Sequence, residues 1–292
     1  MSTDTAPTFK SELIGKWSEP RTFAVTRERI QQYAAATNDE IPQHVAGDVA
    51  PPVFAIVPAF ESLAPAMAAV IPPELLLMTV HGEQDFRFHA PIRPDTELTT
   101  RAKAIGFTPK SSGVTVTALA ETHDQDGQLI VEQYMMSFVR GAQADAGAGE
   151  EPPGHAFPEE LRTQTPIAVI AQTFDADQTF RYSEASGDPV PIHLDDEIAK
   201  AMGLPGIIIH GLCTMAFTSR AVIETACPED PSRLKRIAVR FSSTAFPRNT
   251  ITTAIWDQGD GTYAFETTSD EGASIIKDGL AEVAPETTPK GI

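Results

Sequence analysis

Apolar residues recur at helical spacing in two pairs of segments along the chain. A short amphipathic helix is predicted at 26–37 and again at 176–185. A more apolar segment follows each of them, at 58–70 and at 212–226. In the last segment apolar residues cover most of the helical surface, so this helix is predicted to be buried on most sides. The two short helices each begin at a residue type that caps helices, Thr26 and Asp175.

After each apolar helix, hydrophobic and polar residues alternate with the period of two that is typical of strands. These segments are rich in Thr, Val, Ile and Phe and predict antiparallel strands at 96–104, 113–123, 129–139, 236–241, 250–257, 262–268 and 273–283. Asp/Gly-rich stretches at 124–127 and 257–261 predict hairpin turns. The chain is therefore expected to be of the α+β class.

The same pattern occurs twice because the chain contains an internal repeat. The clearest block holds a tyrosine, an acid, a proline and a histidine at identical spacings in both halves: Tyr33, Asp39, Pro42 and His44, then Tyr182, Asp188, Pro191 and His193. Two further blocks follow in the same order, 88–100 matching 241–253 and 121–127 matching 266–272. A period near half the chain indicates a duplicated domain rather than a solenoid.

The composition between the copies is that of a linker. Residues 141–159 are rich in small, acidic, Pro and Gly residues and have no apolar period. We therefore predict an N-terminal repeat at 10–140 and a C-terminal repeat at 160–285. At 292 residues, the chain is long enough for two such domains.

The net charge of −18 argues against nucleic acid or an anionic membrane as a partner. The two cysteines, Cys213 and Cys227, have neither the spacing of metal ligands nor that of a disulfide framework. No apolar stretch approaches the roughly 18 residues that span a bilayer. Residues 1–7 lack a secretory signal pattern and residues 289–292 are not a peroxisomal Ser-Lys-Leu signal, so a cytoplasmic location is expected.

Candidate chemistry is concentrated in 181–217. Asp188 and His193 lie five residues apart on a segment that Pro189 and Pro191 keep out of helical geometry. A rigid turn that presents one carboxylate and one imidazole is suited to proton transfer. A new helix begins near Gly211, and its free N–H groups would stabilise negative charge on a carbonyl oxygen.

This segment resembles the MaoC-like, R-specific enoyl-CoA hydratases (hydratase 2). Their pattern is an aromatic residue, Gly-Asp-x-Asn-Pro-aliphatic-His, and then a proline-containing turn into His-Gly-Leu. Here it reads Tyr182, then Gly187-Asp-Pro-Val-Pro-Ile-His193, then Pro205 to His210-Gly-Leu212. One position departs, because Val190 stands where the family has Asn. The resemblance implies a double hotdog fold, in which two repeats each wrap an antiparallel sheet around a long buried helix.

The resemblance also implies an activity, the reversible hydration of trans-2-enoyl-CoA to (R)-3-hydroxyacyl-CoA. Asp188 and His193 would form the catalytic dyad, and the Gly211 N–H would be the oxyanion donor. Gly187 and Val190 would contact substrate, with Val190 shaping the pocket for a more apolar acyl group. No metal or redox cofactor is expected, and coenzyme A enters only as part of the thioester. The two repeats would form a pseudo-dimer within one chain, with a homodimer of chains left open.

In the first copy, Asp39 and His44 repeat the dyad spacing without a following His-Gly pair. We interpret them as relict or structural, and the helix at 58–70 as lining the acyl-tail pocket. His210 is interpreted as structural. The basic run Arg233, Lys235 and Arg236 is either a solvated strand edge or an anchor for the coenzyme A phosphates.

Two other functions remain open from the sequence. Some hotdog thioesterases carry a carboxylate near the start of the buried helix; Glu61 occupies that place in the first copy, whereas the second copy has no acid until Glu224. Glu61 is also explained by the helix dipole. The loss of Asn at Val190 allows a non-catalytic acyl-CoA-binding partner subunit.

Overall fold

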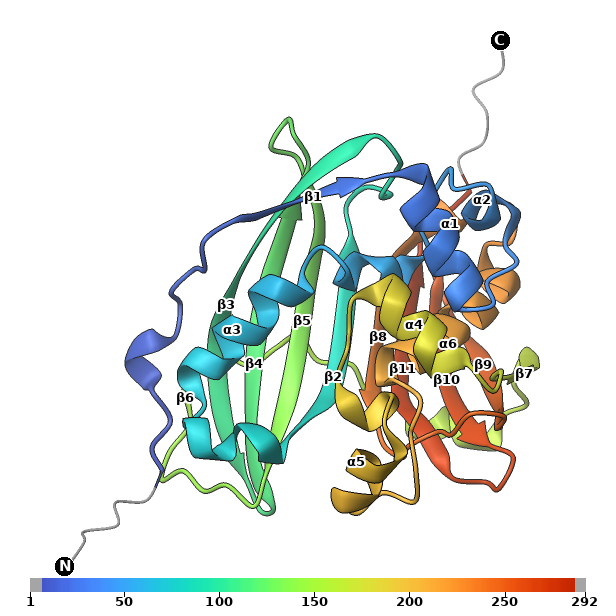
Figure 1. Cartoon of the computed structure of the whole chain (residues 1–292). Helices are drawn as coiled ribbons and strands as arrows, with labels where there is room; N and C mark the ends of the chain where they lie inside the picture. The colour runs from blue at the N-terminus through green and yellow to red at the C-terminus, as the bar shows by residue number, and fades with distance from the viewer. Residues whose placement is uncertain (1–6, 287–292) are drawn as a thin grey trace, which may run out of the picture. The chain divides into compact units, whose positions relative to one another are not determined.

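The computed structural model describes residues 7–286, which fall into two compact units (Figure 1). Unit 1 consists of the chain up to Ala24, Pro58–Asp85 and Glu97–Gly154. Unit 2 consists of Val25–Val57, Phe86–Thr96 and the chain from His155 onward. The terminal residues used above for the location prediction lie mostly outside the described part of the chain.

These units do not coincide with the repeats predicted at 10–140 and 160–285. Two segments of the first repeat, 25–57 and 86–96, belong to the unit that contains the whole second repeat. The predicted linker is also divided, because Gly154 ends unit 1 and His155 begins the last part of unit 2. The repeat boundaries therefore stay a prediction from the sequence. The residues of the candidate site all lie in unit 2.

Unit 1 contains an antiparallel sheet with the strand order β1-β3-β4-β5-β2, and β6 pairs with β3. Helix α3 (Phe60–Val70) packs on β4. Some buried polar groups on the sheet pair with each other, as where the hydroxyls of Thr100 and Thr122 lie 2.9 Å apart on paired strands. The elements of this unit are η1 (Ser11–Leu13), β1 (Arg21–Val25), η3 (Pro73–Met78), β2 (Thr79–Phe88), β3 (Thr96–Lys110), β4 (Gly113–His123), β5 (Leu129–Arg140) and β6 (Ala148–Gly149).

The strand pattern in unit 1 differs from the sequence prediction in the length of one strand and in the presence of others. Strand β3 continues to Lys110 instead of ending at Ala104, because a register shift between Ala104 and Gly106 absorbs the break in alternation. Strands β1 and β2 were not predicted, nor was the two-residue β6. Polar residues interrupt the apolar alternation of β2, so neighbouring strands rather than local pattern decide its structure.

Unit 2 contains the long helix α6 (Gly211–Ala226) and an antiparallel sheet with the strand order β8-β11-β10-β9-β7 (Figure 1). Helix α6 contacts four of these strands, and 11 of its 16 residues are buried, as its pattern predicts. The strands are β7 (Ala168–Thr173), β8 (Leu234–Phe241), β9 (Thr250–Gly259), β10 (Thr262–Ser269) and β11 (Ser274–Val283). Among the described residues, no helix combines the length and the low polarity that crossing a membrane requires.

Shorter helices carry the functional loops of unit 2. They are α1 (Arg27–Ala36), α2 (Pro42–Val45), η2 (Pro52–Ile56), η4 (Glu159–Thr163), α4 (Gln178–Ser186), η5 (Pro191–His193), α5 (Asp196–Ala201) and η6 (Pro231–Arg233). Thr26 caps α1 as predicted, by accepting a hydrogen bond from Arg29 N–H. Asp175 does not cap α4, because its carboxylate binds Arg181, so the helix begins two residues later than predicted.

The internal repeat is visible where α1 packs against α4. Tyr33 and Tyr182, equivalent residues 149 positions apart, place their hydroxyls 3.4 Å from each other. On either side of them, Gln178 Nε2 donates to the Ala36 carbonyl at 2.6 Å and Arg29 Nη2 donates to the Ala185 carbonyl at 3.5 Å. Such reciprocal contacts between equivalent positions are those of a two-fold interface, here formed within one chain.

Candidate active site

Asp188 follows the C-terminal end of α4 and is held there by hydrogen bonds of its main chain and its carboxylate. Gly187 ends the helix in the left-handed region, at φ +77°, which costs glycine little. The carboxylate Oδ1 of Asp188 then accepts the N–H of Val190 at 3.2 Å, and the main-chain oxygen accepts the Ser183 hydroxyl at 2.6 Å. The other carboxylate oxygen has no recorded partner among the described residues, so it is available to a ligand.

His193 ends the short helix η5 and is 8% exposed. Its Nδ1 lies 2.8 Å from the main-chain oxygen of Ile208. Because a carbonyl oxygen only accepts, Nδ1 carries the proton and the Nε2 lone pair of the neutral ring is left for chemistry.

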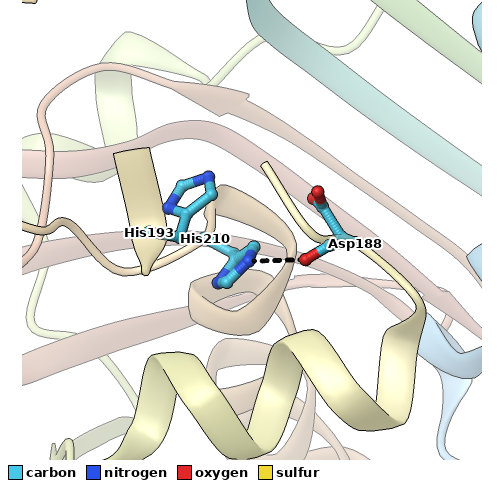
Figure 2. A group of neighbouring side chains, drawn as sticks. All are labelled: Asp188, His193 and His210. Atoms are coloured by element: carbon cyan, nitrogen blue, oxygen red, sulfur yellow. Dashed lines mark hydrogen bonds between the residues drawn. The ribbon is translucent and has the colours of Figure 1, made fainter. Parts of the chain in front are cut away.

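His210 was assigned a structural place from the sequence, and it lies directly against the dyad (Figure 2). Its ring stacks on that of His193, with centroids 3.7 Å apart and planes 22° apart, and it is 1% exposed. Its Nε2 donates to the main-chain oxygen of Asp188 at 3.4 Å, and its ring centroid lies 4.9 Å from that of Tyr182. Seventeen residues separate His210 from His193, so no local spacing pointed to this contact.

Asp188, His193 and His210 each bring one potential metal-ligand atom within 4.8 Å of the others. The residue types would suit a transition metal. The stacking argues against joint ligation, however, because imidazole lone pairs lie in the ring plane. Two nearly parallel rings point these lone pairs side by side instead of converging on one ion. The arrangement is better suited to moving protons than to holding a metal.

Burial shifts the proton affinities of the three side chains. It raises the pKa of Asp188 above the usual value, against the opposing effects of the Val190 N–H and the His193 charge. Burial lowers the pKa of His193, despite its hydrogen bond to Ile208 and the charge of Asp188. Burial and the nearby His193 together lower the pKa of His210 to about 3. Asp188 is thus a stronger base than an exposed aspartate, and both imidazoles are neutral at neutral pH.

Gly211 is the first residue of α6 and directly follows His210. No acceptor for its N–H is recorded in the described part of the chain, as is usual for the first turn of a helix. A Cβ at this position would lie 3.3 Å from Cδ1 and Cε1 of the Phe241 ring. The Phe241 ring thus leaves little room for a side chain at position 211. The Gly211 N–H lies at the positive end of α6 and is suited to bind a carbonyl oxygen.

The first-copy pair, Asp39 and His44, has a different geometry. His44 Nδ1 lies 2.7 Å from Asp39 Oδ2, and their side chains are only 1% and 5% exposed. Both carboxylate oxygens of Asp39 are therefore occupied, one by His44 and the other by the Ile41 N–H, and the pair has almost no solvent access, although His44 Nε2 is buried without a partner. This geometry supports the interpretation of the pair as structural.

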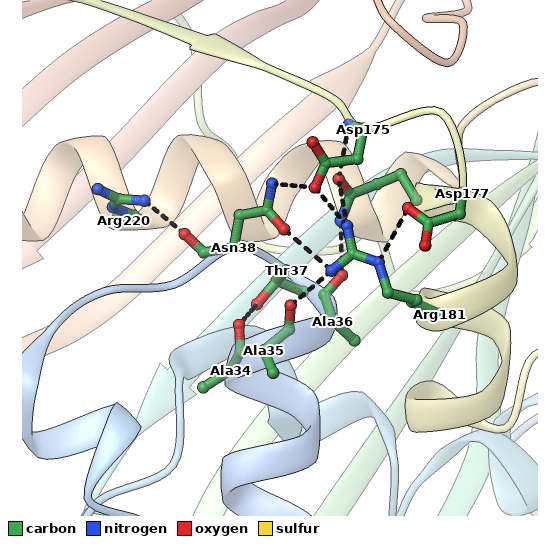
Figure 3. Close-up of polar contacts among 10 residues, drawn as sticks. Ala34, Ala35, Ala36, Thr37, Asn38, Asp175, Asp177, Arg181 and Arg220 are labelled. Atoms are coloured by element: carbon green, nitrogen blue, oxygen red, sulfur yellow. Dashed lines mark hydrogen bonds and ion pairs between the residues drawn. The ribbon is translucent and has the colours of Figure 1, made fainter.

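Two arginines from the second copy fix the loop that carries Asp39 (Figure 3). Arg181 donates to the Ala35 carbonyl at 2.8 Å and to Asn38 Oδ1 at 3.1 Å. Arg220 donates to the Asn38 carbonyl and pairs with Glu40 at 2.8 Å. The loop is thereby held as part of the fold.

Val190 contacts the cluster of Asp188, His193 and His210, whereas the predicted basic run does not belong to it. Val190 is 39% exposed and contributes its N–H, not its side chain, to Asp188, so its proposed effect on the acyl pocket stays a prediction. The basic run Arg233, Lys235 and Arg236 lies at the start of β8, whereas Phe241 beside Gly211 ends that strand. Eight residues at about 3.3 Å each separate Arg233 from Phe241 by roughly 26 Å.

The cations of this run already have partners in unit 2. Arg233 Nη1 lies 3.4 Å from Glu286, Lys235 Nζ donates to the Ser232 carbonyl at 2.9 Å, and Arg236 Nη1 lies 3.1 Å from Glu282. The run is therefore not part of the catalytic cluster, and only the distal end of a long substrate could meet it.

Glu61 and Glu224, the carboxylates considered for a thioesterase, are both exposed to solvent. Glu61 is exposed in the first turn of α3, and Glu224 is exposed and pairs with Arg220 at 2.7 Å. Neither residue has the burial or the imidazole neighbour that Asp188 has.

Comparison with known proteins identifies the family of this chain. The family described as "MaoC like domain" matches residues 157–277, and that described as "FAS1-like, dehydratase domain region" matches residues 12–133. Probable enoyl-CoA hydratase 2 of Dictyostelium discoideum is 32% identical over 214 residues, which are 72% of this chain and 71% of the relative. Peroxisomal multifunctional enzyme type 2 of Drosophila melanogaster is 31% identical over 62% of this chain, a match that covers only 30% of that larger protein.

Solved structures give the same assignment. A MaoC-like dehydratase from Phytophthora capsici superposes with a TM-score of 0.83 at 27% identity, covering 95% of this chain and 98% of its own. A Mycobacterium tuberculosis protein described as a double hotdog fold has a TM-score of 0.59 at 11% identity, covering 92% and 94% of the two chains, and shows the fold alone. The predicted α+β double hotdog is therefore confirmed. The chain belongs to the family of MaoC-like dehydratases and hydratases 2, and it is an enzyme of this hydratase and dehydratase class.

Proposed function

We propose that this enzyme interconverts trans-2-enoyl-CoA and (R)-3-hydroxyacyl-CoA by acid–base chemistry, without a metal or redox cofactor. The observation that carries the proposal is the open pair Asp188 and His193, with its free carboxylate oxygen and free Nε2, next to the start of α6. The R configuration rests on the family resemblance. The related proteins named enoyl-CoA hydratase support the choice of thioester.

In the hydration direction, Asp188 takes a proton from a water molecule that His193 Nε2 orients. The water oxygen bonds to C3, and the electron pair of the C2–C3 double bond moves toward the thioester carbonyl. The Gly211 N–H stabilises the resulting enolate oxygen. A proton then returns from the dyad to C2, on the face from which water was added, so that the pair ends the cycle in its starting state.

Three measurements separate this proposal from its alternatives. A panel of trans-2-enoyl-CoA substrates from crotonyl to decenoyl should lose enoyl absorbance, and chiral analysis should give the R product. Release of free thiol from saturated acyl-CoA would instead indicate a thioesterase. Binding of acyl-CoA without turnover of any panel member would indicate a partner subunit.

As pH is lowered, kcat/KM should fall at a pH above the pKa of an exposed aspartate. Burial raises the pKa of Asp188, and the base form is lost as pH falls through this raised value. Protonation of His193 also abolishes activity. Because the pKa of His193 is lowered, this loss is expected at a lower pH than the one at which an exposed imidazole is protonated. Initial rates on crotonyl-CoA across the acid range test this expectation. A fall in kcat/KM at or above the pKa of free imidazole would contradict the neutral His193 assumed here.

Charge reversal at Arg233 and Lys235 should raise KM for coenzyme A thioesters more than KM for the matching pantetheine thioesters. Only the former carry nucleotide phosphates for the cations to bind. Arg236 is left unchanged because it is 8% exposed and its replacement would disturb packing. The preference for coenzyme A should also weaken with salt, since exposed charges are screened beyond about 10 Å at 0.1 M. Equal changes in KM on both substrates would remove this run from the binding site.

A further inference from the structure

The two repeats provide an internal comparison of the dyad with its first-copy counterpart. Tyr182 and Tyr33 are equivalent, and each meets one ring from the turn that follows its acid–histidine segment. Tyr182 contacts His210 with centroids 4.9 Å apart, and Tyr33 contacts Phe54 with centroids 5.5 Å apart. Phe54, in η2, therefore packs against the first-repeat tyrosine as His210, at the start of α6, packs against the second-repeat tyrosine.

Asp39 and Asp188 make the same hydrogen bond to the backbone that follows them. Asp39 Oδ1 accepts the N–H of Ile41 at 2.9 Å, and Asp188 Oδ1 accepts the N–H of Val190 at 3.2 Å, two residues on in both cases. The histidines differ. His44 Nδ1 binds the Asp39 carboxylate itself, whereas His193 Nδ1 binds the main-chain oxygen of Ile208. Identical spacing in the sequence thus gives a closed pair in one repeat and an open pair in the other.

His210 supplies the contacts that distinguish the open pair. It stacks on the His193 ring, and its Nε2–H holds the Asp188 backbone. A phenylalanine cannot donate this hydrogen bond, and His44 takes part in no ring contact within the described residues. His210 therefore touches both members of the dyad, through the ring of one and the peptide of the other.

We propose that His210 is a positioning residue that keeps the Asp188–His193 pair open. It prevents the His193 ring from turning onto the Asp188 carboxylate as His44 has turned onto Asp39. This inference deepens the proposed function and rests on it for its kinetic consequence. The geometric part does not depend on turnover.

His210→Phe gives Tyr182 the type of ring that Tyr33 meets in the first repeat. The kcat for enoyl-CoA hydration should fall about ten- to a hundredfold, since misplacing a catalytic group by about 1 Å costs up to about a hundredfold. KM should change less than about twofold, because His210 is buried behind the dyad. Phe54→His is the matched control in the other repeat and should leave kcat unchanged.

Proton NMR with ¹⁵N-labelled histidine reports the geometry without substrate. The closed His44–Asp39 pair should give a strongly downfield imidazole N–H resonance, assigned by its loss in His44→Gln. His210→Phe should add a second such resonance that disappears in His210→Phe/His193→Gln. His210→Gln keeps a donor near the Asp188 carbonyl and should recover part of kcat, which separates positioning from a loss of folding.

A His210→Phe variant that keeps wild-type kcat, or that loses kcat without the second resonance, would overturn the positioning role. Wild-type protein that fails to hydrate any enoyl-CoA would instead reject the proposed function. In that case the NMR comparison still decides whether His210 holds the pair open.

Discussion

Asp188→Asn and His193→Gln are each expected to lower kcat for enoyl-CoA hydration by at least about a hundredfold, the usual scale for loss of a general acid or base. Asparagine keeps the shape and the hydrogen bond from Val190 N–H but cannot take a proton from water. Glutamine in place of His193 removes the Nε2 lone pair. Steady-state rates on crotonyl-CoA, with circular dichroism to verify folding, measure both effects.

The same substitutions in the first copy provide the control. Asp39→Asn and His44→Gln should leave kcat largely unchanged, because their pair is closed and buried. They should instead lower the stability of the fold, since leaving a buried hydrogen-bonding group without its partner typically costs about 1–3 kcal/mol. Loss of turnover in these variants, with the second-copy variants active, would show that the active half has been assigned wrongly.

Asp188→Asn should have the opposite effect on stability. Burial raises the pKa of Asp188, so the folded state disfavours the ionised carboxylate once pH exceeds the ordinary aspartate value. A neutral amide avoids this cost, and the thermal midpoint at neutral pH should rise while activity is lost. Such a trade between stability and activity is common at catalytic sites.

The helices and most strands could be predicted because their patterns are local. The alternation in 113–123 corresponds to β4 without correction, and the apolar surface of 212–226 corresponds to α6. The missed strands have no such pattern. Strand β7 has only six residues, and it is ordered by pairing with β9, which lies about 80 residues later in the chain. Long-range pairing of this kind overrides weak local preference.

The candidate site was predictable as a set of residue types but not as a geometry. Asp39/His44 and Asp188/His193 have the same spacing, and sequence alone gives no reason for one pair to close and the other to stay open. We attribute the difference to the ring that packs against the repeat-equivalent tyrosine, a contact between residues far apart in the chain. His210, which was interpreted as structural from the sequence, takes part in this contact.

Gly211→Pro is expected to lower kcat about a hundred- to a thousandfold, the cost of removing one oxyanion donor. Proline deletes the proposed donor, the N–H of residue 211, and also adds a Cβ beside the Phe241 ring. It is well tolerated at the first position of a helix, which Gly211 occupies in α6. The preceding residue must be extended, and His210 already is, at φ −59° and ψ 136°.

Gly211→Ala is the matched control for crowding. Alanine introduces the same Cβ against the Phe241 ring, at 3.3 Å, but keeps the N–H. The ratio of kcat between the alanine and proline variants therefore reports the hydrogen bond, whereas the ratio between wild type and alanine reports the packing. A backbone donor that acts on the enolate should affect kcat far more than KM, because the charge it stabilises develops only in the transition state. Equal kcat in the two variants would mean that the thioester oxygen is bound elsewhere, and the first turn of α6 would then only support the dyad.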